Sequence, residues 1–166
     1  MRKLILGAIL AAMPTLALAG EWVHVTSDDD TDIGIDVETI RIEGDRRTFW
    51  VVVSHRQPQA IDGDPFDYML LRAEANCRTD IMRMNQAILY RLGEDQSAYS
   101  ETLSRTPRYV VPDTTGYHQW SFVCGDDWPT DRALPTAALF ASVMRVANDA
   151  ASAAGEAARS AAEPIY

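Results

Sequence analysis

The two cysteines, Cys77 and Cys124, are the residues of this 166-residue sequence whose chemistry can be defined first. A disulfide between them is the simplest interpretation for a chain that reaches an oxidising compartment. Closing a loop of roughly 48 residues would stabilise the fold by about 4 kcal/mol, because it restricts the unfolded chain. Two separate buried thiols are the alternative. A metal pair is disfavoured, because no C-x-x-C spacing and no nearby histidine supports it.

A run of acidic residues at positions 27–32 (SDDDTD) is the second candidate for a chemical role. Asp28, Asp30 and Asp32 have the alternating spacing of a calcium-binding loop. However, the sixth position of that loop is isoleucine rather than glycine, and the twelfth is threonine rather than glutamate. Because adjacent carboxylates repel one another, we predict a solvated turn here rather than a calcium site.

No constellation of residues predicts catalysis. The sequence has no G-x-S-x-G, no H-E-x-x-H and no glycine-rich phosphate-binding loop. His24, His55 and His118 are dispersed, and none has a histidine partner at the i, i+4 spacing. We therefore expect a protein that is not an enzyme, with no cofactor and no catalytic or metal-binding residues.

Residues 1–19 have the features of a secretory signal peptide. A charged start (MRK) precedes a short apolar run, and an A-L-A sequence fits the small-residue rule for cleavage before Gly20. The run is short for a spanning helix and contains a proline, which disfavours the alternative of a retained anchor. A glycine stands where a lipoprotein would carry its acylated cysteine. We expect a periplasmic or secreted product with no membrane anchor after cleavage.

The charge of the chain limits its partners. The sequence has 24 acidic and 15 basic residues, a net charge of −9, and Lys3 is its only lysine. Nucleic acids and anionic lipids are bound through cations that neutralise them, so we expect neither as a partner. The acidic balance favours solubility.

The segment Ile35–Val53 predicts a hairpin at the middle of a sheet. Ile40 and Ile42 alternate with polar residues, and a Gly-Asp pair at Gly44 provides the chemistry of a tight turn. The following residues, 49–53 (FWVVV), are typical of a central strand that is covered on both faces.

The segments around this hairpin predict further strands. Glu21–Thr26 and Ile33–Val37 alternate as strands do, whereas the prolines and aspartates of Ser54–Asp67 favour a loop at the sheet edge. Apolar residues in Tyr68–Leu92 recur at helical spacing, so the pattern slightly favours a helix over two strands. Tyr99–Val111 is a further candidate strand region, interrupted by a proline.

A short helix is expected to end at the second cysteine. Asp113 can act as its N-cap, and Tyr117, Trp120 and Cys124 then share one apolar face. Gly125 stands where such a helix would end. A helix bonded to the sheet at its last apolar residue would cover a curved face of that sheet.

A final helix is expected after a loop over Asp126–Leu134. Pro135 suits its first turn, and beyond Asn148 the chain is rich in alanine, which favours helix but buries little. We expect this tail to fray. The predicted apolar stripe consists of Leu139, Phe140, Val143, Met144 and Ala147.

The order of several landmarks resembles the surface-adhesin protein E-like family of secreted bacterial domains, over about residues 22–125. The landmarks are Trp22, Ile35-Asp36, Thr39-Ile40-Arg41, Gly44, Trp50-Val51-Val52, Asn76-Cys77, Arg83, Tyr90 with Gly93, Val111-Pro112 and Val123-Cys124. The resemblance implies a small antiparallel sheet, with a helix tethered across its concave face by the two cysteines. It also implies that Tyr68–Leu92 forms two strands joined near residues 78–80. The resemblance also implies a binding function, because the family's named member is an adhesin that binds extracellular host proteins such as vitronectin and laminin and self-associates.

These observations predict an α+β fold: a small antiparallel β-sheet, a short helix tethered across one face by the Cys77–Cys124 disulfide, and a C-terminal Ala-rich helix. The expected segments are a signal peptide (1–19), a surface-adhesin-E-like domain (20–125) and a helical extension (126–166). The predicted function is a non-catalytic binding domain with a protein partner, and a homodimer is expected from the resemblance. The alternative is a carrier that holds a small ligand or a metal on the concave face of the sheet.

Overall fold

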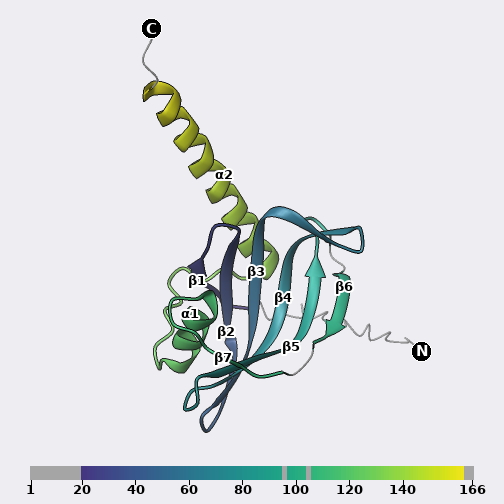
Figure 1. The fold of residues 1–166 in the computed structure, drawn as a ribbon, viewed down its shortest axis with the longest axis vertical. Coiled ribbons are helices and arrows are strands. Elements are labelled where there is room, and N and C mark those ends of the chain that lie inside the picture. Colours follow the sequence, from purple (N-terminus) through teal and green to yellow (C-terminus); the bar gives the residue numbers. More distant parts are fainter. Residues whose placement is uncertain (1–19, 95–96, 104–105, 163–166) are drawn as a thin grey trace, which may run out of the picture.

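The centre of the protein is an antiparallel sheet whose strands lie side by side in chain order, as a computed structural model shows (Figure 1). The structure describes residues 20–94, 97–103 and 106–162, so the predicted signal peptide lies outside the described residues. The sheet order is β1-β2-β3-β4-β5-β6, and β7 pairs with β5. The elements are β1 (Trp22–Ser27), β2 (Thr31–Glu43), β3 (Arg46–Ile61), β4 (Asp64–Asn76), β5 (Ile81–Tyr90), β6 (Ser97–Thr102), β7 (Arg108–Tyr109), α1 (Thr115–Cys124) and α2 (Ala137–Ala162).

The predicted hairpin is present, and its second strand, β3, is central in the sheet. Gly44 has a φ of 60°, a conformation that glycine adopts without the steric cost of a side chain. Phe49 and Val51 are buried on one face of β3, and Val52 is buried on the other. The sequence predicted separate strands at Ile33–Val37 and around Ile40 and Ile42, but both belong to one strand, β2. The alternation of faces is interrupted by an irregularity in the ladder between Asp36 and Arg41, which does not end the strand.

The loop predicted over Ser54–Asp67 is wrong. β3 continues to Ile61, turns through Asp62 and Gly63, and returns as β4. Both turn residues have positive φ (52° and 89°), as in the two-residue turns whose twist matches a hairpin. Pro58 does not prevent pairing, because it lies in a shift of the ladder between Ser54 and Gln59, where a missing N–H group is tolerated; Pro65 lies opposite Ala60, next to the turn.

The helix favoured by pattern over Tyr68–Leu92 is also wrong, and the two strands implied by the family resemblance are confirmed. β4 and β5 are joined by a turn at residues 77–80. Opposite Arg72 and Ala73, β5 contains one extra residue, Asn85, which reverses the alternation of its faces. Met84 therefore packs on one face of the sheet, whereas Tyr90 packs on the other.

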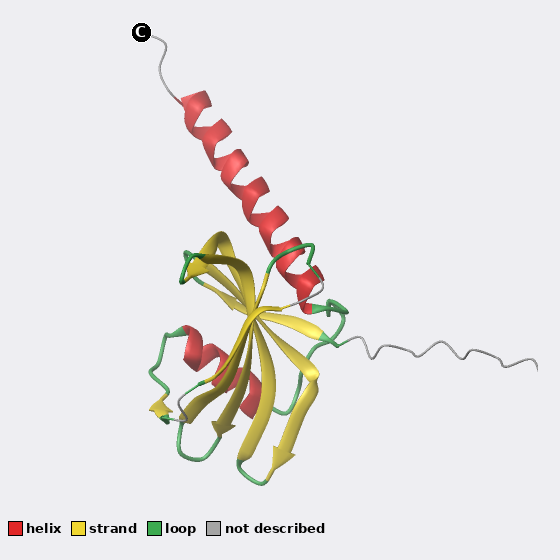
Figure 2. Ribbon diagram, turned by 90° about the vertical axis from the view of Figure 1, so that its right-hand side faces the viewer, coloured by secondary structure: helices red, strands yellow, loops and turns green. Residues whose placement is uncertain are grey.

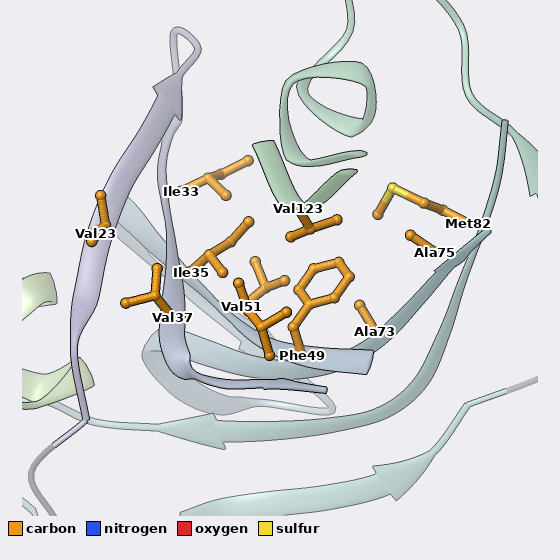
Figure 3. Close-up of a cluster of buried hydrophobic side chains, with 11 residues drawn as sticks. Val23, Ile33, Ile35, Val37, Phe49, Val51, Ala73, Ala75, Met82 and Val123 are labelled. Carbon is orange, nitrogen blue, oxygen red and sulfur yellow. The ribbon is translucent and has the colours of Figure 1, made fainter. Parts of the chain in front are cut away.

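The sheet has a separate hydrophobic core on each face. Phe49, Val51 and Ala73 pack beneath Val123 of α1, in a cluster to which β1, β2 and β5 also contribute (Figure 3). On the other face, the aromatic ring of Phe140 in α2 is completely buried in a second cluster. The predicted fold class, α+β with a helix tethered across one face, is confirmed.

Helix α1 begins one residue later than predicted. Thr114, not Asp113, is its N-cap, and its hydroxyl accepts a hydrogen bond from the Tyr117 N–H group at 3.2 Å. Asp113 has a φ of 61° and lies outside the helix, which ends before Gly125 as predicted.

The face of α1 that is buried differs from the predicted one. Gln119 and Val123 are its buried residues, whereas Tyr117 and Trp120 are half-buried at its flank. The reason is that α1 lies against β1 and β2 as well as β4, so its buried face is set by contacts with these strands and not by the disulfide alone.

Helix α2 lies on the sheet only at its N-terminal end. Thr136 caps it, accepting a hydrogen bond from the Leu139 N–H group, and Phe140 and Ala141 are fully buried. The predicted stripe is partly wrong, because Leu139 and Val143 are exposed. The helix continues to Ala162 and projects away from the sheet (Figures 1 and 2). Fraying of this extension in solution stays a prediction.

Candidate functional site

The disulfide joins the turn after β4 to the last residue of α1. Cys77 and Cys124 are bonded, with their Cα atoms 5.5 Å apart. The Trp120 indole N–H group donates to the Asn76 carbonyl oxygen at 3.2 Å, and the Cys77 N–H group donates to the Asp45 carbonyl oxygen at 2.8 Å. One end of α1 is therefore held to the β4–β5 turn by a covalent bond and a hydrogen bond, and that turn is itself hydrogen-bonded to the β2–β3 turn. The bond is structural and leaves no thiol for chemistry, because both cysteines of the sequence are used.

An apolar recess of ≈ 630 Å³ lies beside α1 on the same face of the sheet. We call it the β7 recess; the residues that line it include Met82, Met84, Leu103, Tyr109, Val111 and Gly116, together with the arginines Arg83 and Arg108. Its floor is formed by Met82 and Met84 of β5. At its rim, Tyr109 is 78% exposed and Val111 is 59% exposed. Large apolar side chains at such exposure, around a concave surface, are typical of a site that a partner or a ligand covers.

The chain around the β7 recess is held in place by short contacts with the sheet. Met82 pairs with Arg108 and Ile81 with Tyr109, which attaches β7 to β5. Just after β7, the Val110 N–H group donates to the Asp80 carbonyl oxygen at 2.8 Å. Sequence reasoning missed this site, because its rim comes from an irregular segment without periodicity. The Tyr-Val-Val run before a proline was the available signal.

A buried aspartate connects the β1–β2 hairpin to α2. Asp32 is 4% exposed, and it accepts hydrogen bonds from the Ser27 hydroxyl at 2.6 Å and from the Asn148 side-chain amide at 2.7 Å. The prediction that residues 27–32 form a solvated turn is therefore wrong for Asp32. The partner that accounts for its burial lies 116 positions away in the sequence.

His24 lies near the same pair, but the arrangement does not activate the serine. Its Nε2 atom is 2.9 Å from Ser27 Oγ and 3.9 Å from Asp32 Oδ1. The single hydroxyl hydrogen of Ser27 is donated to the aspartate, so the histidine donates to the serine rather than accepting from it. A nucleophilic serine needs the opposite polarity, with a base that receives its proton. We therefore assign this cluster to the docking of α2.

The calcium alternative at the acidic turn has no support from the geometry. Asp28 folds back on its own turn and accepts hydrogen bonds from the N–H groups of Asp30 and Thr31. Burial alone would raise the pKa of Asp28, but these bonds and the charge of Arg56 outweigh it and lower the pKa. Within residues 20–94, 97–103 and 106–162, no three histidine, cysteine, aspartate or glutamate side chains are grouped so as to hold a metal ion.

The other two histidines lie on different elements. His55, on β3, is half-buried and contacts Phe66 edge-on, with ring centroids 5.3 Å apart. Burial lowers its pKa, and the charges of Asp28 and Asp30 offset part of that effect. His118, on α1, is exposed. The described part of the chain also contains no helix long and apolar enough to cross a membrane.

Comparison with known proteins agrees with the resemblance seen in the sequence. The family profile named surface-adhesin protein E matches residues 22–125, which is more than half of the chain. The crystal structure of protein E from non-typeable Haemophilus influenzae is similar, with a TM-score of 0.49 and 16% sequence identity, over 68% of this chain and 80% of that chain. Among curated proteins, no significant match was found. The family-profile match over residues 22–125 shows that this chain belongs to the surface-adhesin protein E family.

Proposed function

We propose that this domain is a non-catalytic binding module that engages a protein partner through the β7 recess. The observation that carries the proposal is the pair of exposed rim residues, Tyr109 and Val111, above an apolar floor. Tyrosine and methionine are enriched at protein interfaces, because they supply large contact areas when they are covered. Tyr109 at the rim and Met82 and Met84 in the floor match that composition.

We further propose that residues 1–19 are removed as a signal peptide, and that the domain acts in the periplasm or outside the cell. The disulfide supports this proposal, because such bonds persist in oxidising compartments. Family membership also supports it, since the family is named for a surface adhesin. Intact mass measurement of the purified protein should find a chain that begins at Gly20.

The second candidate function is a carrier of a small apolar ligand. The volume of the β7 recess, ≈ 630 Å³, favours it, because small-molecule sites usually span about 300–1,000 Å³. Native mass spectrometry distinguishes the two functions, since a carrier retains one ligand per chain. The same spectrum reports whether the chain forms the homodimer that the family resemblance implies.

The binding experiment uses two substitutions at the rim, Tyr109→Ser and Val111→Ser, in one variant. Both side chains are exposed, so the fold should be preserved and the circular dichroism melt should be unchanged. We expect the wild-type protein to bind immobilised vitronectin or laminin, and the variant to bind at least about tenfold more weakly, a loss of about 1.4 kcal/mol.

The matched control is Val146→Ser, which replaces a valine of 68% exposure on α2, an element that does not line the recess. Its affinity should equal that of the wild type. An equal loss of affinity in the rim variant and in Val146→Ser would show that the partner does not bind specifically at the β7 recess. Absence of binding to either matrix protein, with a stoichiometric ligand retained in the native spectrum, would favour the carrier instead.

A further inference from the structure

A second concave site lies on the opposite face of the sheet from the β7 recess. We call it the arginine basin; it is a cavity of ≈ 400 Å³ lined by Thr48, Arg72, Glu74, Arg83, Asn85 and Thr102. In the ladder, Glu74 pairs with both Thr48 and Arg83, so the three side chains share one face. This is the face on which Val52 packs against α2, but the basin lies towards the other end of the strands, among β3, β4, β5 and β6.

Positive charge exceeds negative charge in and around the arginine basin. Arg46 and Arg83 each place their Nε atom 3.5 Å from the same carboxylate oxygen, Oε1 of Glu74. The third guanidinium, that of Arg72, is exposed and makes no ion pair or side-chain hydrogen bond with any described residue. The residues that line the basin therefore include two arginines, Arg72 and Arg83, and one carboxylate, Glu74, in a chain whose net charge is −9.

The wall of the arginine basin also contains a polar group that lacks a partner. The side-chain Oδ1 atom of Asn85 is buried and has no hydrogen-bond partner among the described residues. Asn85 is the extra residue in β5, so its position is a consequence of the irregularity in the β4–β5 ladder. Buried polar groups in folded proteins are nearly always paired, and the oxygen and nitrogen of an amide can exchange places. The side-chain nitrogen of an asparagine is a neutral donor, and Asn85 lines the basin, so it can contribute a hydrogen bond to an anion bound there.

We propose that the arginine basin binds a small molecule through an oxyanion group, a carboxylate, phosphate or sulfate. Arg72 provides a fork of N–H groups that none of the described residues occupies, and Arg83 can turn one of its donors from Glu74 to the ligand. The cavity is large enough for a molecule with several polar groups but encloses no macromolecule. Glu74 competes with the ligand, because it already occupies two of the guanidinium groups.

The test is isothermal titration calorimetry of the full-length mature protein with phosphate, sulfate and citrate, each at an ionic strength matched with sodium chloride. We expect saturable binding of one ion per chain, with a Kd tighter than about 1 mM. Arg72→Gln should weaken it at least about tenfold, since this arginine has no structural partner to lose. Glu74→Gln should strengthen it, because the competing carboxylate is gone.

The control is Arg132→Gln, whose side chain is 94% exposed and lies outside the basin. It should bind as the wild type does. Binding of citrate alone would assign the site to carboxylates, and binding of phosphate or sulfate alone would assign it to tetrahedral oxyanions. If no ion shows saturable binding, or if Arg132→Gln loses as much affinity as Arg72→Gln, the proposal is wrong. Glu74→Gln removes two ion pairs and is the variant more at risk of not folding. In that case, the affinities of Arg72→Gln and Arg132→Gln for the ion test the proposal.

Discussion

At the scale of single residues, buried polar groups in this protein are stabilised by specific partners. Asp36 accepts hydrogen bonds from the N–H groups of Glu21 and Glu38, and Asp32 accepts from Ser27 and Asn148. A carboxylate without such partners would be costly to bury, because it loses its hydration. These bonds explain how two acidic residues can lie inside a sheet.

The burial of Tyr68 leads to a prediction about the stability of the protein at alkaline pH. It is 5% exposed and stacks on Tyr90 with ring centroids 5.1 Å apart. Burial, followed by the charges of Tyr90 and Asp67, raises the pKa of Tyr68 to about 12. The unfolded chain has a tyrosine pKa of about 10, so the folded state favours the neutral phenol. Its stabilising effect is complete below pH 10 and is lost as the pH rises from about 10 to 12.

The expected loss is about 3 kcal/mol in the free energy of unfolding, at about 1.4 kcal/mol for each pKa unit. Urea denaturation between pH 8 and 11.5 should detect about 2 kcal/mol of this loss, because the upper limit lies below the folded-state pKa. Tyr68→Phe is the control, since it keeps the ring and removes the titrating group. The variant should lose less stability over this range than the wild type does. Identical pH dependence in the two proteins would show that the phenol is not responsible.

At the scale of elements, the docking of α2 depends on a gap in β2. Gly34 has no side chain, and the ring of Phe140 fills the space above it. A Cβ atom at Gly34 would lie 2.6 Å from the ring carbon Cε2 of Phe140. Polar contacts support the same interface, because Arg145 of α2 donates to an Asp67 carboxylate oxygen at 2.9 Å. The helix is therefore anchored near its N-terminus, where the interface is both apolar and charged.

We expect Gly34→Ala to destabilise the protein by about 1–3 kcal/mol, the usual cost of overpacking a core. Hydrogen exchange should also increase in residues 137–149 of α2, because the change displaces Phe140. Gly116→Ala is the matched control: its Cβ would lie 3.6 Å from Thr114 Oγ1, an ordinary contact, and alanine favours helix. If both variants are equally stable, the close packing of Phe140 on Gly34 does not limit the docking of α2.

At the scale of the whole molecule, one covalent bond holds the two layers of the first core together. The disulfide connects residues 47 positions apart and fixes α1 over the sheet. Beneath it, Val123 packs with Phe49 and Ala73 (Figure 3). Without the bond, α1 would be held by one buried face and a few hydrogen bonds, which is little for a helix of ten residues.

Replacing either cysteine, as Cys77→Ala or Cys124→Ala, should therefore lower the free energy of unfolding by about 2–5 kcal/mol. Chemical denaturation measures the loss, and the reduced wild-type protein should show a similar one. Titration of free thiols in the unfolded, unreduced protein checks the bond directly. Two reactive thiols per chain would contradict both the bond and the tethered helix.

The sequence alone was sufficient for the features that depend on neighbouring residues. The Gly44 turn, the central strand at residues 49–53, and the end of α1 at Gly125 follow from backbone preference and short-range alternation, and each is confirmed. The predicted disulfide is likewise confirmed, and that prediction required only the number of cysteines and the predicted signal peptide. Such signals are strong because a turn, a strand face or a helix end is determined by a few adjacent residues.

Tertiary structure decided the features that depend on residues far apart in the chain. The extra residue Asn85 interrupts the strand periodicity of β5, so the apolar residues of this segment matched a helical pattern. Cross-strand pairing rather than local periodicity sets the face on which each side chain lies. Asp32 is buried because Asn148 reaches it, and Gly34 matters because Phe140 packs on it. The β7 recess and the arginine basin have the same origin. Each assembles side chains from separate elements, and no single segment of the sequence contains enough of either site to indicate it.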